Sequence, residues 1–131
     1  MSRGKSHDPV AELFGEFGDR LRGDRWLPDV DVFESTSSVV VRFELAGVRS
    51  EDLRVTVDGG MLRVSGVRRV LDRSDVKRLH QMEIATGPFE RRVQIPVPID
   101  REAVSANLAD GFLTVVLPRR EAGPRQVEIE E

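Results

Sequence analysis

The chain has 131 residues, carries 20 Lys and Arg against 23 Asp and Glu, and contains no cysteine. A chain of this length forms one domain and can bury a hydrophobic core without disulfides or metals. The lack of cysteine excludes disulfide scaffolds, thiolate zinc sites and thiol catalysis, and the net charge of −3 gives no overall attraction to nucleic acid.

Residues 1–28 form the predicted N-terminal arm. Its polar start has no apolar run typical of a signal peptide, and no part of the chain approaches the ~20 apolar residues of a membrane span, so we expect a soluble, cytoplasmic protein. Apolar side chains then follow at helical spacing: Val10, Leu13, Phe14, Phe17 and Leu21. Asp8 suits an N-cap and Pro9 the first helical position, which predicts a short amphipathic helix. Such a short helix is marginal in isolation, so we expect it to order against a partner surface.

From residue 30 onward the hydrophobic pattern is that of β-strands, because apolar and more polar side chains alternate. The segments predicted as strands are 30–33, 39–45, 53–57, 61–67, 81–86, 89–95, 104–108 and 112–117. Asp58-Gly59-Gly60 and Ala109-Asp110-Gly111 supply tight turns, so each joins two strands in a hairpin. About eight short strands at this spacing predict an all-β fold, an immunoglobulin-like antiparallel sandwich over residues 29–118.

Residues 119–131 form the predicted C-terminal extension. Its first part, 119–126, is polar and rich in residues that break regular structure, and we interpret it as a linker. In an extended segment Val127 and Ile129 project from one face, as addition to a sheet edge requires, whereas a frayed terminus is the simpler alternative. The linker spans at most about 26 Å, which reaches its own sandwich or a neighbouring one.

Candidates for catalysis are few. The only histidines, His7 and His80, lie in polar segments, and no nucleophile and base are recognisable as a pair. Asp29 and Asp31 could form a carboxylate pair for hydrolysis, but they share one row of a short strand and are more simply explained as facing solvent. We therefore expect no enzyme, and a hydrolase is the least favoured hypothesis.

A basic stretch runs from Arg68 to Arg78, with five cationic residues against two acidic ones. It could contact a phosphate backbone weakly, but it has no interleaved aromatic residues and no helix to enter a groove. A solvated loop or an ion-pairing arm is the favoured interpretation, and we expect no nucleic-acid partner.

Arg91 falls on the apolar row of its predicted strand, with Phe89 and Val93. Because desolvation of a lone guanidinium costs several kcal/mol, Arg91 needs a partner. Two interpretations remain open: an intramolecular pair with the stem of the side chain packed on the core, or an ion pair across a subunit interface.

Several segments, taken in chain order, resemble the small heat shock protein (alpha-crystallin) family, bacterial type. The resemblance covers residues 26–34, 43–48, 62–66 and 87–93. Its most specific part is the segment 106–113, which matches the family signature A-x-x-x-n-G-x-L with Ala106, Gly111 and Leu113. Val127-Glu128-Ile129 matches the C-terminal I-x-I/V motif with Val in the first place, whereas Ala46 stands where the family usually has Pro.

The resemblance implies an ATP-independent holdase chaperone that binds partly unfolded client proteins, needs no cofactor or metal, and hands clients to ATP-dependent refolding chaperones. It implies a homodimer that exchanges the segment 70–79. The implied interface residues are Arg91, Val70, Leu71, Val76 and Leu79. Clients would contact Val10, Leu13, Phe14, Phe17, Leu21 and Trp26. Val127 and Ile129 would dock between the edge strands of another dimer.

The arm and the tail are short for a family that builds large assemblies through these parts. We therefore expect a dimer as the stable unit, with weak higher oligomers. The alternative to a holdase is a CS-type co-chaperone or interaction module that binds one specific folded partner.

Overall fold

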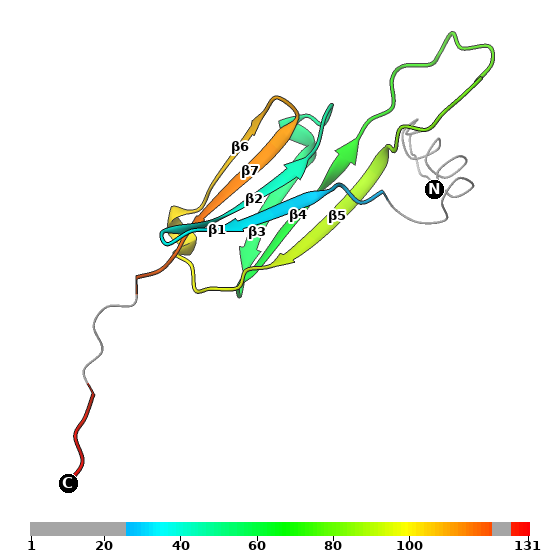
Figure 1. The fold of residues 1–131 in the computed structure, drawn as a ribbon. Helices are drawn as coiled ribbons and strands as arrows, with labels where there is room; N and C mark the ends of the chain where they lie inside the picture. The colour runs from blue at the N-terminus through cyan, green and yellow to red at the C-terminus, as the bar shows by residue number, and fades with distance from the viewer. Residues whose placement is uncertain (1–25, 122–126) are drawn as a thin grey trace, which may run out of the picture.

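The computed structural model describes residues 26–121 and 127–131 (Figure 1). Its strands are β1 (Val30–Glu34), β2 (Ser38–Glu44), β3 (Leu53–Asp58), β4 (Met61–Arg68), β5 (Gly87–Gln94), β6 (Ser105–Ala109) and β7 (Phe112–Pro118). Two short 3₁₀ helices, η3 (Ser50–Asp52) and η4 (Arg101–Ala103), lie in the connections. The amphipathic pattern at residues 10–21 lies outside the described residues.

The strands form two antiparallel sheets, one in the order β1-β2-β7-β6 and the other in the order β3-β4-β5. Apolar side chains on the facing rows meet between the sheets, and Val32, Val41 and Val115 illustrate the register across β1, β2 and β7. The buried core consists of Trp26, Val39, Val41, Phe43, Leu45, Val48, Leu62, Val64, Phe89, Val93, Ile95, Ile99, Leu113, Val115 and Leu117. This arrangement confirms the predicted all-β, antiparallel sandwich.

Two tight turns close the hairpins as predicted. Gly59 and Gly60 have φ angles of 57° and 81° between β3 and β4, and Asp110 and Gly111 have φ angles of 55° and 83° between β6 and β7. Two successive residues with positive φ are typical of a type I′ turn, whose twist matches that of the flanking strands. The Gly-Gly and Asp-Gly pairs are therefore where the backbone needs them.

The predicted strand at residues 81–86 is wrong, and the described residues contain seven strands rather than eight. Residues 69–86 instead form a long loop that projects from one end of the sandwich (Figure 1). The β4–β5 ladder ends at the pair Arg68 and Gly87, so residues 81–86 have no neighbouring strand in this single chain. Alternation of side chains alone does not supply the backbone partner that a strand requires.

At the opposite end of the sandwich, the chain leaves β7 against the turn between β1 and β2. The backbone N–H of Arg119 donates to the carbonyl of Ser37 at 2.8 Å, and the N–H of Arg120 donates to the carbonyl of Pro98 at 3.0 Å. The C-terminal extension therefore begins from a fixed point on the fold.

Candidate interaction surfaces

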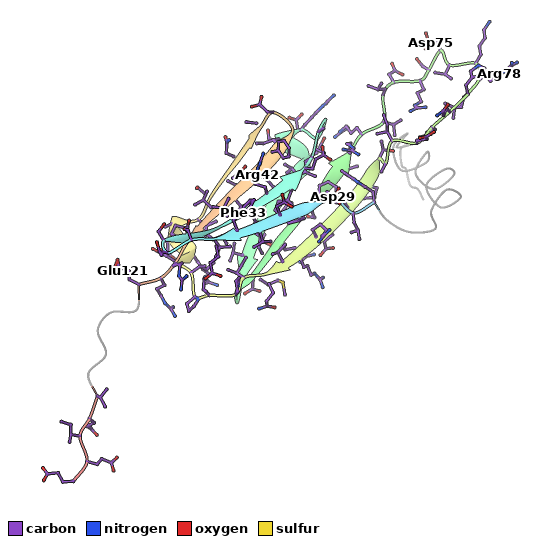
Figure 2. All side chains as sticks on the ribbon, in the orientation of Figure 1. Asp29, Phe33, Arg42, Asp75, Arg78 and Glu121 are labelled. Atoms are coloured by element: carbon purple, nitrogen blue, oxygen red, sulfur yellow. The ribbon has the colours of Figure 1, made fainter. Side chains whose placement is uncertain are left out.

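Strand β1 is an edge of its sheet, because only β2 pairs with it. Val32 belongs to the row that faces the second sheet, since it pairs with the buried Val41, yet it remains 46% exposed. Phe33, on the outer row of the same strand, is 52% exposed and is labelled in Figure 2. An edge with unpaired backbone groups and apolar side chains is a template for another strand.

The loop 69–86 holds four of the residues expected at a dimer interface. Val70 is half-buried, whereas Leu71, Val76 and Leu79 are exposed, Leu71 by 83%. Ile84, in the same loop, is 76% exposed. The loop thus exposes several apolar side chains to water. Clusters of exposed apolar side chains are uncommon on the surface of a monomeric protein.

The charged tip of this loop is solvated, as favoured from the sequence, whereas Arg73 is half-buried. Asp75 and Arg78 lie at its far end, away from the sandwich (Figure 2). Closer to β4, Arg69 forms a bidentate ion pair with Asp52. Its Nε and Nη2 donate to the two carboxylate oxygens, each with a nitrogen–oxygen distance of 2.7 Å. The hydrogen bond from Arg69 holds the pKa of Asp52 below its ordinary value. This pair ties the start of the loop to η3.

Arg91 is half-buried on the row shared by the buried Phe89 and Val93. Its Nη1 donates a hydrogen bond of 2.9 Å to the carbonyl oxygen of Pro28. Within the chain its partner is thus a backbone carbonyl of the segment that leads into β1, not a carboxylate. Because this contact joins β5 to the start of β1, these two edge strands share one side of the sandwich.

Trp26 lies in the core, which differs from its expected place on a client-binding surface. Its side chain is only 6% exposed, and its ring meets that of Phe89 edge to face with centroids 4.9 Å apart. The guanidinium of Arg68 stacks on the indole at 4.0 Å. Trp26 therefore serves packing in this fold and is not available to contact clients in the folded chain.

Arg68 is a functional candidate that its place in a basic stretch of sequence does not single out. Its Nε and Nη2 donate to the carbonyl of Ala85 at 2.9 and 2.7 Å, and its Nη1 donates to the carbonyl of Ala46 at 3.1 Å. Burial lowers the pKa of Arg68, and the nearby Glu44 acts in the opposite direction. A signal was present, because Arg68 follows Leu62, Val64 and Gly66 on the inward row of β4.

The outer face of the three-stranded sheet carries an ion-pair ladder. Glu90 Oε2 accepts from Nε of Arg63 at 2.7 Å and from Nε of Arg92 at 3.1 Å. Partial burial raises the pKa of Glu90, but the two guanidinium groups more than offset this and hold it below its usual value. These pairs keep this face charged, which separates it from the apolar edge of β1.

Strands β3 and β6 are the remaining edges, opposite the side shared by β1 and β5. They present half-buried apolar side chains that pack on the core, namely Val55 and Val57 from β3 and Leu108 from β6. Of the signature residues, Ala106 is on β6 and Gly111 in the turn that follows it, whereas Leu113 is buried on β7, one strand in from this edge. Val127 and Ile129 in the tail are 73% and 86% exposed in the single chain.

The weaker candidates do not come together as a catalytic site. Asp29 and Asp31 are exposed at β1, and His80 is exposed in the loop 69–86. In the part of the chain that the structure describes, no group of three or more His, Asp or Glu side chains could hold a metal ion. Across the same residues, no helix is long and apolar enough to cross a membrane.

The chain is similar to known proteins in both sequence and structure. The sequence profile of the Hsp20/alpha crystallin family matches residues 31–130. Heat shock protein 16 of Schizosaccharomyces pombe is 36% identical over 104 residues, which cover 78% of this chain and 73% of that protein. Spore protein SP21 of Stigmatella aurantiaca is 31% identical over 114 residues, which cover 86% of this chain and 68% of that protein.

Solved structures agree. Heat shock protein 16.0 from Schizosaccharomyces pombe superimposes with a TM-score of 0.69 at 34% identity, over 81% of this chain and 100% of that chain. A small heat-shock protein from Xylella fastidiosa gives a TM-score of 0.70 at 28% identity, over 82% of this chain and 100% of that chain. The family is one of heat shock chaperones and is not known for enzymes, and none of these matches supports the CS-type alternative. The chain therefore belongs to the Hsp20/alpha crystallin family, the small heat shock proteins.

Proposed function

We propose that this chain is an ATP-independent holdase that binds partly unfolded proteins and prevents their aggregation. The observation that carries the proposal is that a sandwich with a complete core still exposes large apolar side chains on its edge, loop and tail. They are Val32, Phe33, Leu71, Ile84, Val127 and Ile129. Exposed apolar surface of this kind is typical of interaction sites.

The unit of function is a homodimer in which the segment 70–79 of one chain adds to the free edge of β1 in the other. Three features support this proposal: the unpaired side of β1, the exposed Val32 and Phe33 beside it, and the exposed apolar side chains of the loop. Strand addition would satisfy backbone groups of both segments and cover these side chains. Arg91 contributes by holding the segment before β1 through the Pro28 carbonyl.

The tail joins dimers weakly into higher oligomers. Val127 and Ile129 dock between the edges of β3 and β6 in a neighbouring dimer. The apolar contact surface there would be formed by the half-buried side chains of Val55, Val57 and Leu108. The small side chain of Ala106 leaves room beside them. An extended segment with alternate apolar side chains fits such a surface.

Clients bind mainly to the part of the N-terminal arm before Trp26, which lies outside the described residues, through apolar side chains at helical spacing. These are Val10, Leu13, Phe14, Phe17 and Leu21. A short amphipathic segment that is marginal as a free helix can adapt to many partners at low specificity. Bound clients then pass to ATP-dependent refolding chaperones.

The test is light scattering of a heated client protein without ATP. We expect the parent chain to suppress scattering at substoichiometric ratios, and the double variant Phe14→Ser, Phe17→Ser to lose most of this effect. The matched control, Glu12→Ser with Glu16→Ser, changes the same segment but should keep full activity. Undiminished client aggregation at an excess of the parent chain would overturn the proposal.

A further inference from the structure

Arg68 lies where three segments far apart in the sequence meet. The first is the segment before β1, through the ring of Trp26. The second is the end of the loop 69–86, through the carbonyl of Ala85, and the third is the turn after β2, through the carbonyl of Ala46. Trp26 itself packs on Phe89 at the start of β5. One side chain therefore connects the base of the N-terminal arm to the base of the loop.

The partners of Arg68 are unusual for a half-buried cation. It uses three N–H groups on two carbonyls and the face of its plane on an aromatic ring, and none of these hydrogen bonds goes to a carboxylate. A guanidinium removed from water needs all of these contacts, because each lost one leaves part of its desolvation cost uncompensated. A planar fork can stack and donate in two directions at once, which a lysine ammonium cannot do.

The start of the loop is tied to η3 by the Arg69–Asp52 ion pair, whereas its other end is held through Arg68. A cavity of about 470 Å³, lined by Ala46, Val70, Met82 and Ile84 among others, lies beside Arg68 at the base of the loop. The apolar side chains at its rim are incompletely packed, and Ile84 is largely exposed. The carbonyl of Ala85 is therefore a main point at which the end of the loop is fastened.

We propose that Arg68 is a positioning residue that couples Trp26, at the base of the N-terminal arm, to the loop 69–86, so that Trp26 and the loop leave the sandwich together. When Trp26 moves away, the stacked face of the guanidinium becomes open to water, which then competes for the Ala85 carbonyl. When the loop moves and Ala85 moves with it, the guanidinium loses two hydrogen bonds. It is then no longer held in place over the indole. Such coupling is reciprocal by thermodynamic necessity.

The coupling is a property of the fold and goes beyond the proposed function. Its consequence for clients does rest on that function: release of the exchange segment would also free Trp26, the residue that anchors the base of the client-binding arm. A chaperone with this link exposes both apolar segments in one step.

The experiment uses two client-free readouts on the full chain. Trp26 is the only tryptophan, so intrinsic emission reports its burial, and limited trypsin digestion at Arg73, Lys77 and Arg78 reports opening of the loop. Proteolysis follows the population of the open form when opening is fast. Far-UV circular dichroism confirms that each variant is folded under the conditions used.

We expect Arg68→Lys to shift Trp26 emission to the red and to raise loop cleavage about fivefold, because the fork and the stacking are lost. Arg54→Lys is the matched control, since it makes the same change at an exposed position of β3. It should leave the emission unchanged. A variant Arg68→Lys that changes one readout without the other would overturn the coupling.

The reverse direction is tested from Trp26 and stays decisive should Arg68→Lys fail to fold. Trp26→Leu removes the aromatic face and should raise loop cleavage about two- to fivefold, with Trp26→Phe intermediate. Cleavage equal to that of the parent in both variants would show that Trp26 only fills the core. Neither readout involves a client, so this failure is separate from a failure in the aggregation assay.

Discussion

The two ends of the sandwich are each fastened by an arginine, but the chemistry differs. At the loop end, Arg68 is half-buried and holds two carbonyls and an indole. At the tail end, Arg119 Nη1 lies 2.9 Å from Glu34 Oε2, with side chains that are 35% and 45% exposed. There the backbone N–H of Arg119 is also bonded to Ser37.

The difference indicates which end can be released. An exposed ion pair contributes little to the free energy of unfolding, so the tail end is held mainly by its backbone hydrogen bonds. Beyond the last ladder pair, Arg68 and Gly87, the loop end is held by side-chain contacts: those of the half-buried Arg68 and the Arg69–Asp52 ion pair. The release proposed above would therefore occur at the end of the sandwich where side chains make the attachment.

The largest effect is expected at Gly66, which lies beside Phe89 at the loop end. A Cβ there would come within 2.4 Å of the carbonyl oxygen of Asp52 and 3.1 Å of Phe89 Cζ. We expect Gly66→Ala to lower the free energy of unfolding by about 3 kcal/mol in urea titration. Gly59→Ala is the control: no atom lies within 4 Å, and its φ of 57° leaves a cost of about 1 kcal/mol.

Arg91→Gly should have the next largest effect, because it frees the segment before β1. The lost hydrogen bond from a charged donor to Pro28 is worth about 2 kcal/mol. In sedimentation experiments on a dilution series, we expect the dimer of this variant to dissociate at a higher protein concentration than the parent dimer. Arg92→Gly carries the same backbone change on the exposed row and should leave dissociation near that of the parent; equal behaviour of the two variants would contradict the role of Arg91.

The pH dependence of the loop attachment sharpens the comparison further. The pKa of Asp52 is lowered in the folded chain, so its contribution to stability is present above its unfolded pKa of about 4 and is lost as the pH falls through the folded value. Asp52→Asn should therefore lower the urea midpoint at pH 7. The gap from the parent should close towards pH 3, and a gap that persists there would argue against this ion pair.

A smaller effect is expected at the tail end. Arg119→Gln removes an exposed pair with Glu34 but keeps the backbone hydrogen bonds, so the free energy of unfolding should fall by only about 0.5 kcal/mol. Thermal or urea denaturation measures this. A loss as large as that of Arg91→Gly would show that the two ends are not held differently.

The smallest effect on folding is expected from replacing Val127 and Ile129 by Ser, since both are exposed in the single chain. The unfolding midpoint should not change, whereas any assembly beyond the dimer should disappear in light scattering after size-exclusion chromatography. Survival of large assemblies in this variant would exclude the tail as their link.

Much of the fold follows from local sequence. Alternation placed Val39, Val41 and Phe43 on one buried row, and the pairs Gly59-Gly60 and Asp110-Gly111 located both tight turns. Arg91 was also recognisable as a cation on an apolar row. These features are readable because a strand has a period of two residues and because positive φ angles favour few residue types.

Tertiary structure decided the rest. Residues 81–86 alternate like a strand but have no neighbouring strand, so they form part of the loop. The sequence predicts Trp26 as an exposed apolar residue of the arm and Arg68 as one cation of a solvated stretch. In the fold, Trp26 packs on Phe89 and Arg68 donates to the carbonyl of Ala85. Periodicity assigns a side chain to a face, but the partner that covers it comes from a distant segment, and only the folded chain determines which segment that is.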